Sequence, residues 1–439
     1  MAHIVSIFKK GNRNDPTCYR GLSINSSVSR LFGKVLQGRL RDSIGDKISE
    51  DQSGFTPGKS CTDNLFVLQQ VMEKKIAVDQ EVHLAFIDLE KAYDSIPRSK
   101  IWEVLNILEV DRPLLNIIKE LYKENESYVK IGHRLSNPIN TTKGLRQGCS
   151  LSPLIFNAYV EVALREWKTK CQGMGIPIGD NTLFTLNFAD DQVVIAQDSY
   201  DLEFMTKRLY QEYNKWGLQV SLKKTEYLAV NSNACFEVFI NDNVQIQQVD
   251  KFKYLGATIN NEGLGKEEIQ TRIQKSKQVI GCLNSLWWDR NLSATTKKRL
   301  GRTLVESVLC YGSELWTLSA DAKRKIQVVE MDYLRRSAGI SRMEKKTNIE
   351  VRRIMNASEE TVLDRIEKSS LKWFGHVLRM PENRWPKRVF QWAPQGRRKR
   401  GRPRKSWNGT VTEAMEARNL EADDALNRDV WRRVTGRQQ

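Results

Sequence analysis

Apolar and polar positions alternate along the first half of the chain at two different spacings. Apolar side chains recur every three or four positions, which predicts amphipathic helices, at residues 25–40, 63–76, 114–122 and 202–216. Short runs rich in β-branched and aromatic residues predict strands at 82–88, 128–131, 183–187, 192–196, 225–231, 236–240 and 252–259. The mixture predicts an α+β fold, and the close spacing of the runs at 183–187 and 192–196 predicts a tight hairpin.

Strand signals become scarce after residue 265. Long charged segments with helical apolar spacing predict helices at 267–286, 293–309, 321–337 and 359–378. Beyond residue 380, Pro, Gly and Arg are frequent, which predicts an extended basic linker followed by a short helix near 411–418. The pattern therefore predicts an α+β part, a helical part and a basic tail.

Length and cysteine usage narrow the class of protein. A chain of 439 residues exceeds what one hydrophobic core usually supports, so we expect several domains or subdomains. No apolar run approaches the roughly 20 residues of a membrane helix, and the run at 4–8 is too short for a signal-peptide core. The seven cysteines form no C-x-x-C clip. We therefore expect an intracellular protein with reduced thiols, no membrane contact and no structural zinc.

Positive charge is concentrated near the C-terminus. The net charge is +17, and residues 381–410 hold ten Lys or Arg against one acid. Such a block attracts polyanions, of which nucleic acid is the commonest for an intracellular protein. The alternative is a solvated, disordered tail.

Three aspartates mark the candidate chemistry. Asp88 ends a predicted strand, and Asp190 and Asp191 sit on the turn of the predicted hairpin. An Asp-Asp pair on a turn is common for backbone reasons alone. These acids, however, are flanked by apolar strand residues. Burying a carboxylate in such surroundings is unfavourable in free energy unless a cation or a hydrogen-bond partner lies next to it. Convergent carboxylates are what nucleotidyl transfer requires, since they hold two Mg²⁺ ions about 4 Å apart.

Motifs around these acids resemble those of reverse transcriptases. Residues 85–94 (AFIDLEKAYD) resemble the first palm motif, and residues 188–191 (FADD) resemble the second metal-binding motif. Between them, residues 144–153 (GLRQGCSLSP) resemble the loop and helix that position template and nucleotide. The order of the three motifs is that of the family.

Further motifs resemble the non-LTR (LINE-like) retrotransposon branch and extend the resemblance over nearly the whole chain. Residues 19–23 (YRGLS) and 53–60 (SGFTPGKS) resemble finger motifs, and residues 252–256 (FKYLG) resemble the primer-gripping hairpin. Residues 311–316 (YGSELW) and 373–380 (WFGHVLRM) resemble segments of the helical domain.

The resemblance implies an RNA-directed DNA polymerase with a right-hand fold of class α+β. Fingers would span 1–80, a palm with an antiparallel sheet 81–262, a helical thumb 263–380 and a basic tail 381–439. The partners would be an RNA template, a DNA primer or target DNA and dNTPs, with the nucleus as the place of action. Family members commonly carry an upstream endonuclease, so we expect this chain to be a fragment or truncated copy. The alternative is a catalytically inactive remnant that only binds nucleic acid.

The resemblance also implies roles for individual residues. Asp88 and Asp190 would be the principal ligands of two Mg²⁺ ions, or of Mn²⁺, with Asp191 and the carbonyl of Leu89 as further ligands. Tyr93 would stand against the sugar 2′ position and so prefer deoxynucleotides; a packed aromatic is the alternative. An RNA-templated RNA polymerase would have a small residue there.

Other positions would contact nucleotide and nucleic acid. Gln147 and Gly148 would lie beside the nascent base pair, or form a plain turn, and Lys224 would lie near the triphosphate, or be an ordinary loop lysine. The primer end would lie on Lys253, Tyr254, Leu255 and Gly256. A segment of the tail resembles an AT-hook core, although generic phosphate binding is equally compatible with it; its residues are Arg400, Gly401, Arg402, Pro403 and Arg404.

The sequence departs from the branch's pattern at two finger positions. Thr56 stands where Arg is usual, which puts one contact to nucleotide or template in doubt, although Lys59 keeps a positive charge nearby. Gly21 stands where Pro is frequent. Both departures make weakened activity an expectation.

Overall fold

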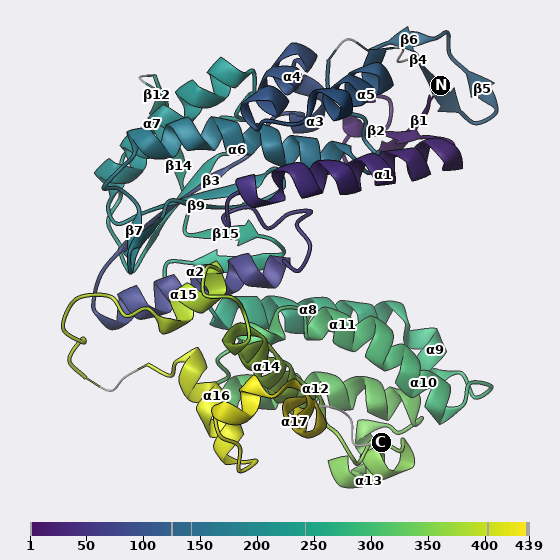
Figure 1. Cartoon of the computed structure of the whole chain (residues 1–439). Helices are drawn as coiled ribbons and strands as arrows, with labels where there is room; N and C mark the ends of the chain where they lie inside the picture. The colour runs from purple at the N-terminus through teal and green to yellow at the C-terminus, as the bar shows by residue number, and fades with distance from the viewer. Residues whose placement is uncertain (1, 124–125, 142, 242, 402–403, 436–439) are drawn as a thin grey trace. The chain divides into compact units, whose positions relative to one another are not determined.

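The computed structural model describes the chain except for residues 1, 124–125, 142, 242, 402–403 and 436–439 (Figure 1). The chain forms two compact units. The first consists of Met1–Asn64, Val82–Ala229 and Asn233–Val249, and the second of Leu65–Glu81, Val230–Ser232 and Asp250–Gln439. No helix in the described part is both long and apolar enough to cross a membrane.

A mainly antiparallel sheet forms the centre of the first unit. Its strand order is β14-β11-β3-β10-β9, with bounds β3 Val82–Ile87, β9 Thr185–Phe188, β10 Asp191–Ala196, β11 Glu226–Val230 and β14 Gln247–Gln248. β10 pairs antiparallel with both β3 and β9. Every residue of β3 is buried, which explains why its sequence is an unbroken apolar run rather than an alternation. The α+β class and the β9–β10 hairpin are thereby confirmed.

Five helices of this unit share one apolar core with the sheet. They are α3 Ala92–Ser95, α4 Arg98–Ile107, α5 Arg112–Lys123, α6 Ser152–Lys170 and α7 Ser199–Trp216. In α6, Tyr159 and Trp167 are fully buried, and the Trp167 indole donates to the carbonyl of Met205 at 2.8 Å. A buried indole with a satisfied N–H contributes large apolar area without a polar penalty.

A second sheet contains the N-terminal segment, which the sequence pattern did not assign to strands. Its order is β2-β1-β4-β5, with β6 paired to β4; the bounds are β1 Ala2–Phe8, β2 Tyr19–Ile24, β4 Glu126–Ile131, β5 Arg134–Leu135 and β6 Ile139–Asn140. β1 runs parallel to β4 across more than a hundred residues of sequence. Two small hairpins complete the unit, β7 Ile176–Ile178 with β8 Asn181–Leu183, and β12 Phe239–Asn241 with β13 Val244–Gln245.

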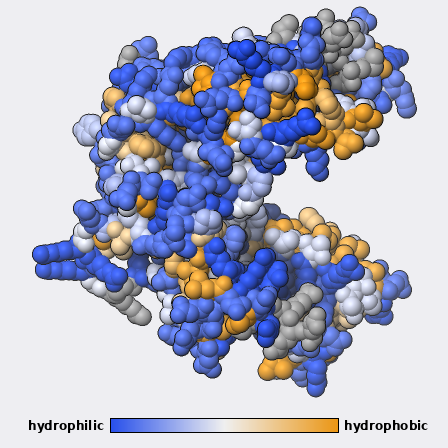
Figure 2. Space-filling model, viewed as in Figure 1, coloured by the Kyte–Doolittle hydropathy of each residue, from blue (hydrophilic) through white to orange (hydrophobic). Residues whose placement is uncertain are grey.

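Helix α1 (Ser27–Ile44) is amphipathic as predicted, but its first turns bury less than expected. Leu36, Leu40 and Ile44 enter the core of the unit. The apolar residues of the first half stay exposed, and Figure 2 shows apolar atoms gathered there; they are Val28, Leu31, Phe32 and Val35. Apolar spacing alone does not reveal which turns of a helix have a packing partner.

The second unit is largely helical, as predicted. Helix α2 (Cys61–Ala77) belongs mostly to it, together with β15 Lys251–Tyr254, β16 Ala257–Asn260 and β17 Gly263–Leu264. The longer helices are α8 Lys266–Cys282, α12 Ala320–Ser337 and α14 Val362–Leu378. The shorter ones are α9 Asn284–Trp288, α10 Ala294–Leu300, α11 Ser307–Leu309, α13 Asn348–Ile354, α15 Trp385–Gln391, α16 Trp407–Glu416 and α17 Arg428–Thr435.

The C-terminal segment is more structured than its composition predicts. The segment expected to be an extended linker contains α15, and the helix expected near 411–418 begins earlier, at Trp407. The reason is aromatic burial: Trp407 is 0% exposed and packs edge-to-face on Phe66 of α2, with ring centroids 4.9 Å apart. The division into 1–80, 81–262, 263–380 and 381–439 stays a prediction, and the two compact units do not coincide with it.

Candidate active site

Asp88, Asp190 and Asp191 come together at one end of the central sheet. β3 ends at Ile87, so Asp88 follows directly, and the β9–β10 turn consists of Ala189 and Asp190. Ala189 adopts a left-handed conformation with φ of 58°, which reverses the chain within two residues. The register pairs Gln192 with Ile87, so Asp191 and Asp88 are neighbours across adjacent strands.

The pKa of Asp191 is raised, partly because Asp190 and Asp88 lie close to it. Desolvation by the surrounding protein is the largest cause that raises it, and the negative charges of Asp190 and Asp88 raise it further, to about 6. Three like charges at one sheet end repel one another, and a cation at that end would relieve the repulsion.

Lys224 reaches the same place from the loop before β11. Its Nζ lies 3.0 Å from Oδ2 of Asp88. The loop is held there by backbone contacts, because the N–H of Ser221 donates to the carbonyl of Asp88 at 2.8 Å and Leu89 forms an isolated bridge with Val220. Lys224 therefore lies beside the carboxylate of Asp88, and its role near a triphosphate stays a prediction.

The oxygen atoms of the three aspartates and of the Leu89 carbonyl are suitable ligands for a hard divalent cation, although the side chains are not arranged around a single point. Among the described residues, no three or more His, Cys, Asp or Glu side chains are grouped closely enough to hold an ion. The Asp88 carboxylate is engaged by Lys224 instead. Carboxylate oxygens with a backbone carbonyl nearby are nevertheless the ligands that Mg²⁺ and Mn²⁺ prefer.

The segment from Gln52 into the first turn of α2 holds the β9–β10 turn in place, and the sequence pattern did not indicate these contacts. The side-chain oxygen of Gln52 accepts from the N–H of Ala189 at 3.0 Å and from that of Gly54 at 2.9 Å. The N–H of Ser53 donates to the carbonyl of Asn187 at 2.8 Å. Asn64 donates to the same carbonyl at 3.1 Å. These contacts fix the turn that carries Asp190.

Gly54 lies so close to the turn that no side chain fits. A Cβ on Gly54 would lie 2.1 Å from the backbone nitrogen of Ala189 and 2.8 Å from the carbonyl carbon of Phe188. In the sequence, Gly54 stands out only as part of the motif at residues 53–60, which does not indicate what the glycine contacts. Only the fold brings position 54 against position 189.

Tyr93 lies on α3 and packs against an aromatic residue of α6. Its ring stacks on Phe156 of α6, with centroids 4.7 Å apart and 14° between the planes. Burial is the main cause that raises the pKa of its hydroxyl, and the charge of Asp190 raises it further. The hydroxyl has no hydrogen-bond partner among the described residues. A role in sugar selection stays a prediction.

Gln147 and Gly148 lie where the N-terminal strands meet the loop before α6. The amide of Gln147 donates to Asp94 at 2.9 Å and accepts from Nε of Arg20 at 3.4 Å. A Cβ on Gly148 would lie 2.5 Å from the carbonyl oxygen of Ser23, and φ at Gly148 is +101°, so glycine is required on both counts. Arg20, which lowers the pKa of Tyr93, is a further basic residue of this site.

Lys59, which keeps a positive charge near Thr56, is engaged by its own loop. Its side chain is only 6% exposed and pairs with the Glu50 carboxylate at 3.0 Å. It also donates to the carbonyls of Glu50 and Gln52, each at 3.1 Å. Lys59 therefore holds the loop that contacts the β9–β10 turn.

The predicted primer-binding residues belong to the second unit. Leu255 and Gly256 form the β15–β16 turn with φ of 44° and 83°. Tyr311 donates to the carbonyl of Leu255 at 2.8 Å, and Arg272 donates to that of Gly256. The side chains of this unit thus fix the turn after Lys253 and Tyr254, whose contact with a primer stays a prediction.

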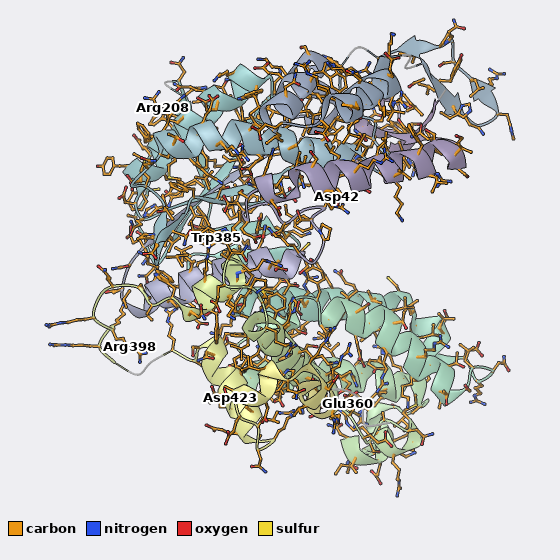
Figure 3. The ribbon with its side chains drawn as sticks, viewed as in Figure 1. Asp42, Arg208, Glu360, Trp385, Arg398 and Asp423 are labelled. Carbon is orange, nitrogen blue, oxygen red and sulfur yellow. The ribbon has the colours of Figure 1, made fainter. Side chains whose placement is uncertain are left out.

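The basic tail segment forms the loop between α15 and α16, where Arg398 is labelled in Figure 3. Arg400, Gly401 and Arg404 are exposed on it. Arg402 and Pro403 lie outside the described residues, so the AT-hook prediction is neither supported nor contradicted.

One end of the central sheet thus carries Asp88 and Asp191 on adjacent strands, with Asp190 on the neighbouring turn and Lys224 beside Asp88. The sequence profile described as Reverse transcriptase (RNA-dependent DNA polymerase) matches residues 7–259, more than half of the chain. The chain therefore belongs to the reverse transcriptase family. The resemblance that its motifs carried is confirmed.

The curated relatives are proteins of retrotransposable elements. The polyprotein of the type-1 element R2 from Nasonia vitripennis is 26% identical over 270 residues, which is 59% of this chain and 26% of that protein. The probable RNA-directed DNA polymerase of the X-element from Drosophila melanogaster is 22% identical over 435 residues, or 91% of this chain and 44% of that protein. The chain thus spans about a quarter to less than half of these relatives.

Among solved structures, telomerase from Candida tropicalis in complex with a fragment of telomeric RNA is similar. It is 13% identical, covers 89% of this chain and 64% of its own, and has a TM-score of 0.45.

Proposed function

We propose that this chain catalyses RNA-templated addition of deoxynucleotides to the 3′ end of a DNA primer. The observation that carries the proposal is the meeting of Asp88, Asp190 and Asp191 at one sheet end, with the like-charge effect on the pKa of Asp191. The partners would be an RNA template, a primer or target DNA and dNTPs, and the place of action the nucleus.

Asp88, Asp190 and Asp191, with the carbonyl of Leu89, would hold the metal ions. Two Mg²⁺ ions bound there would acidify the primer 3′-hydroxyl and neutralise the triphosphate. Asp88 would exchange its contact with Lys224 for this role, since its carboxylate now accepts from Nζ. Lys224 would then face the triphosphate with its charge and donate a proton to the leaving pyrophosphate.

The other residues of the site would position the substrate. Tyr93 would exclude a 2′-hydroxyl, since its ring is held by Phe156 and lies near Asp190. Gln147 and Gly148 would border the base pair, with Arg20 supplying charge. Because the amide of Gln147 is bonded at both ends, we expect it to act by fixing the loop rather than by adapting to each base.

Primer extension with oligo(dT) on poly(rA) tests the proposal. Incorporation of dTTP that requires Mg²⁺ and is lost in Asp190→Ala is expected. Asp180→Ala is the matched control, because Asp180 is an exposed acid in the turn of the β7–β8 hairpin of the same unit. Nucleic-acid binding without extension would favour the alternative of an inactive remnant.

A further inference from the structure

The second unit contains a cavity of about 830 Å³ that has no part in the carboxylate site. It is lined by residues of α2, of β17 before α8, and of the loop that joins α15 to α16. Its volume is that of sites which bury one small molecule or one unit of a polymer.

The loop that borders the cavity is tied down at several points, so the cavity is built rather than incidental. The backbone N–H of Lys399 donates to the carbonyl of Ala77 at 3.0 Å, and its Nζ pairs with Asp79 at 2.6 Å. At the far end of the loop, the N–H of Trp407 donates to the Glu73 carboxylate at 2.9 Å.

Two glutamines of α2 line the cavity and leave buried amide atoms unsatisfied. Gln69 is 4% exposed and Gln70 is 1% exposed. Among the described residues, Oε1 of Gln69 and Nε2 of Gln70 have no hydrogen-bond partner. The other end of the Gln69 amide donates to the carbonyl of Leu315 at 2.6 Å, which fixes its orientation. One acceptor and one donor beside the cavity are therefore unsatisfied, which is unfavourable for buried polar atoms.

The remaining lining combines an apolar wall with free positive charge. Met72, Ile76 and Phe390 supply the wall, with Phe390 as an aromatic ring. Three arginines of the loop also line the cavity and make no ion pair or side-chain hydrogen bond within the described part of the chain: Arg398, Arg400 and Arg404. The neighbouring lysines differ, since Lys74 donates to three carbonyls and Lys405 pairs with Glu413.

We propose that this cavity takes one nucleotide of a single-stranded nucleic acid. The base would lie against Phe390 and the apolar wall, with its donor and acceptor edge on the amides of Gln69 and Gln70. The flanking phosphates would lie on the loop arginines, whose planar guanidinium groups match phosphate oxygens. A duplex keeps its bases stacked and does not offer one to a cavity, so single strands are preferred.

Fluorescence anisotropy with short labelled oligo(dT) tests the proposal on the full chain, in EDTA and with Asp190→Ala as the background for every variant. Arg400→Ala is expected to weaken binding by about tenfold, because the variant loses one charge-assisted hydrogen bond to a phosphate. Arg397→Ala is the matched control, because Arg397 is exposed on the same loop but does not line the cavity. Equal losses in the two variants would show generic attraction to a basic loop and would overturn the proposal.

An oligonucleotide with abasic sites separates base recognition from phosphate contact. Wild-type protein is expected to bind it about tenfold more weakly than oligo(dT), because base contacts are lost. Gln70→Leu, which keeps the shape of the side chain and removes the unsatisfied amide, is expected to reduce this ratio while leaving the melting temperature unchanged or higher. A ratio near one in wild type, or an unchanged ratio in a folded Gln70→Leu variant, would contradict base binding.

Free dTMP serves as the last probe. Competition by dTMP alone at the strength of oligo(dT) would assign the cavity to a mononucleotide and overturn the proposal of a polymer ligand. Because no readout uses catalysis, the result stands whether or not the chain extends a primer.

Discussion

The close approach of Gly54 to the β9–β10 turn, which carries Asp190, makes Gly54→Ala a sharp test of the proposed site. A Cβ at position 54 would lie 2.1 Å from the Ala189 nitrogen, whereas ordinary contacts begin near 3.4 Å, so the turn must move by about 1 Å. Gly54 does not have a positive φ, so alanine carries no backbone penalty of its own. The strain falls on the segment between Phe188 and Asp190. A displacement of that size at reacting groups costs about 100-fold in rate.

The expected result is therefore a fall of about 100-fold in kcat with primer–template affinity unchanged. Overpacking of this kind also costs about 1–3 kcal/mol of stability. Steady-state primer extension gives kcat, and anisotropy in EDTA gives the affinity. The control is Gly38→Ala, since Gly38 lies in α1 with open space around its Cβ position.

A second substitution distinguishes displacement from general unfolding. Ala189 has φ of 58°, which glycine adopts more readily, so Ala189→Gly in the Gly54→Ala background is expected to restore part of the activity. Activity of Gly54→Ala within threefold of wild type would refute the reasoning. So would an equal loss in Gly38→Ala.

Three further predictions concern other residues. Tyr93→Ala is expected to raise the ratio of ribonucleotide to deoxynucleotide incorporation by tenfold or more in single-nucleotide extension, as one steric contact is worth about 1–3 kcal/mol; an unchanged ratio would leave Tyr93 a packing residue. Glu330→Gln is expected to lower the free energy of unfolding by about 3–5 kcal/mol, because Glu330 is 2% exposed and accepts from Arg352 and from the N–H of Val362. Exposed Glu359→Gln is its control in urea unfolding, and equal effects would contradict the argument. Desolvation raises the pKa of Glu73 to about 7 in the folded state. Between about pH 4.5 and 7 the folded state therefore holds a proton that the unfolded state has released, so stability falls as pH rises through this range. Glu73→Gln is expected to flatten the decline of melting temperature between pH 5 and 7, and an identical pH profile would count against it.

Local patterns in the sequence were sufficient to predict the class of fold and to single out three candidate acids. The run at 82–88 is apolar throughout because β3 is buried on both faces, and the runs around FADD are short because they form a hairpin. Carboxylates in such apolar surroundings require a counter-charge, so Asp88, Asp190 and Asp191 were recognisable before any contact was known. Motif order then indicated the family.

Contacts between segments far apart in the chain were decided only by the tertiary structure. Gln52 and Ala189 are 137 residues apart, and nothing local to either residue indicates their hydrogen bond. Lys59 carries a positive charge in the sequence, yet the fold neutralises it with Glu50. The composition of the basic loop predicted an extended linker, yet Lys399 and Trp407 tie it to α2 beside a cavity. The physical reason is the same in each case: sequence sets what a side chain can do, whereas packing decides which partner it meets and whether any of that capacity remains free.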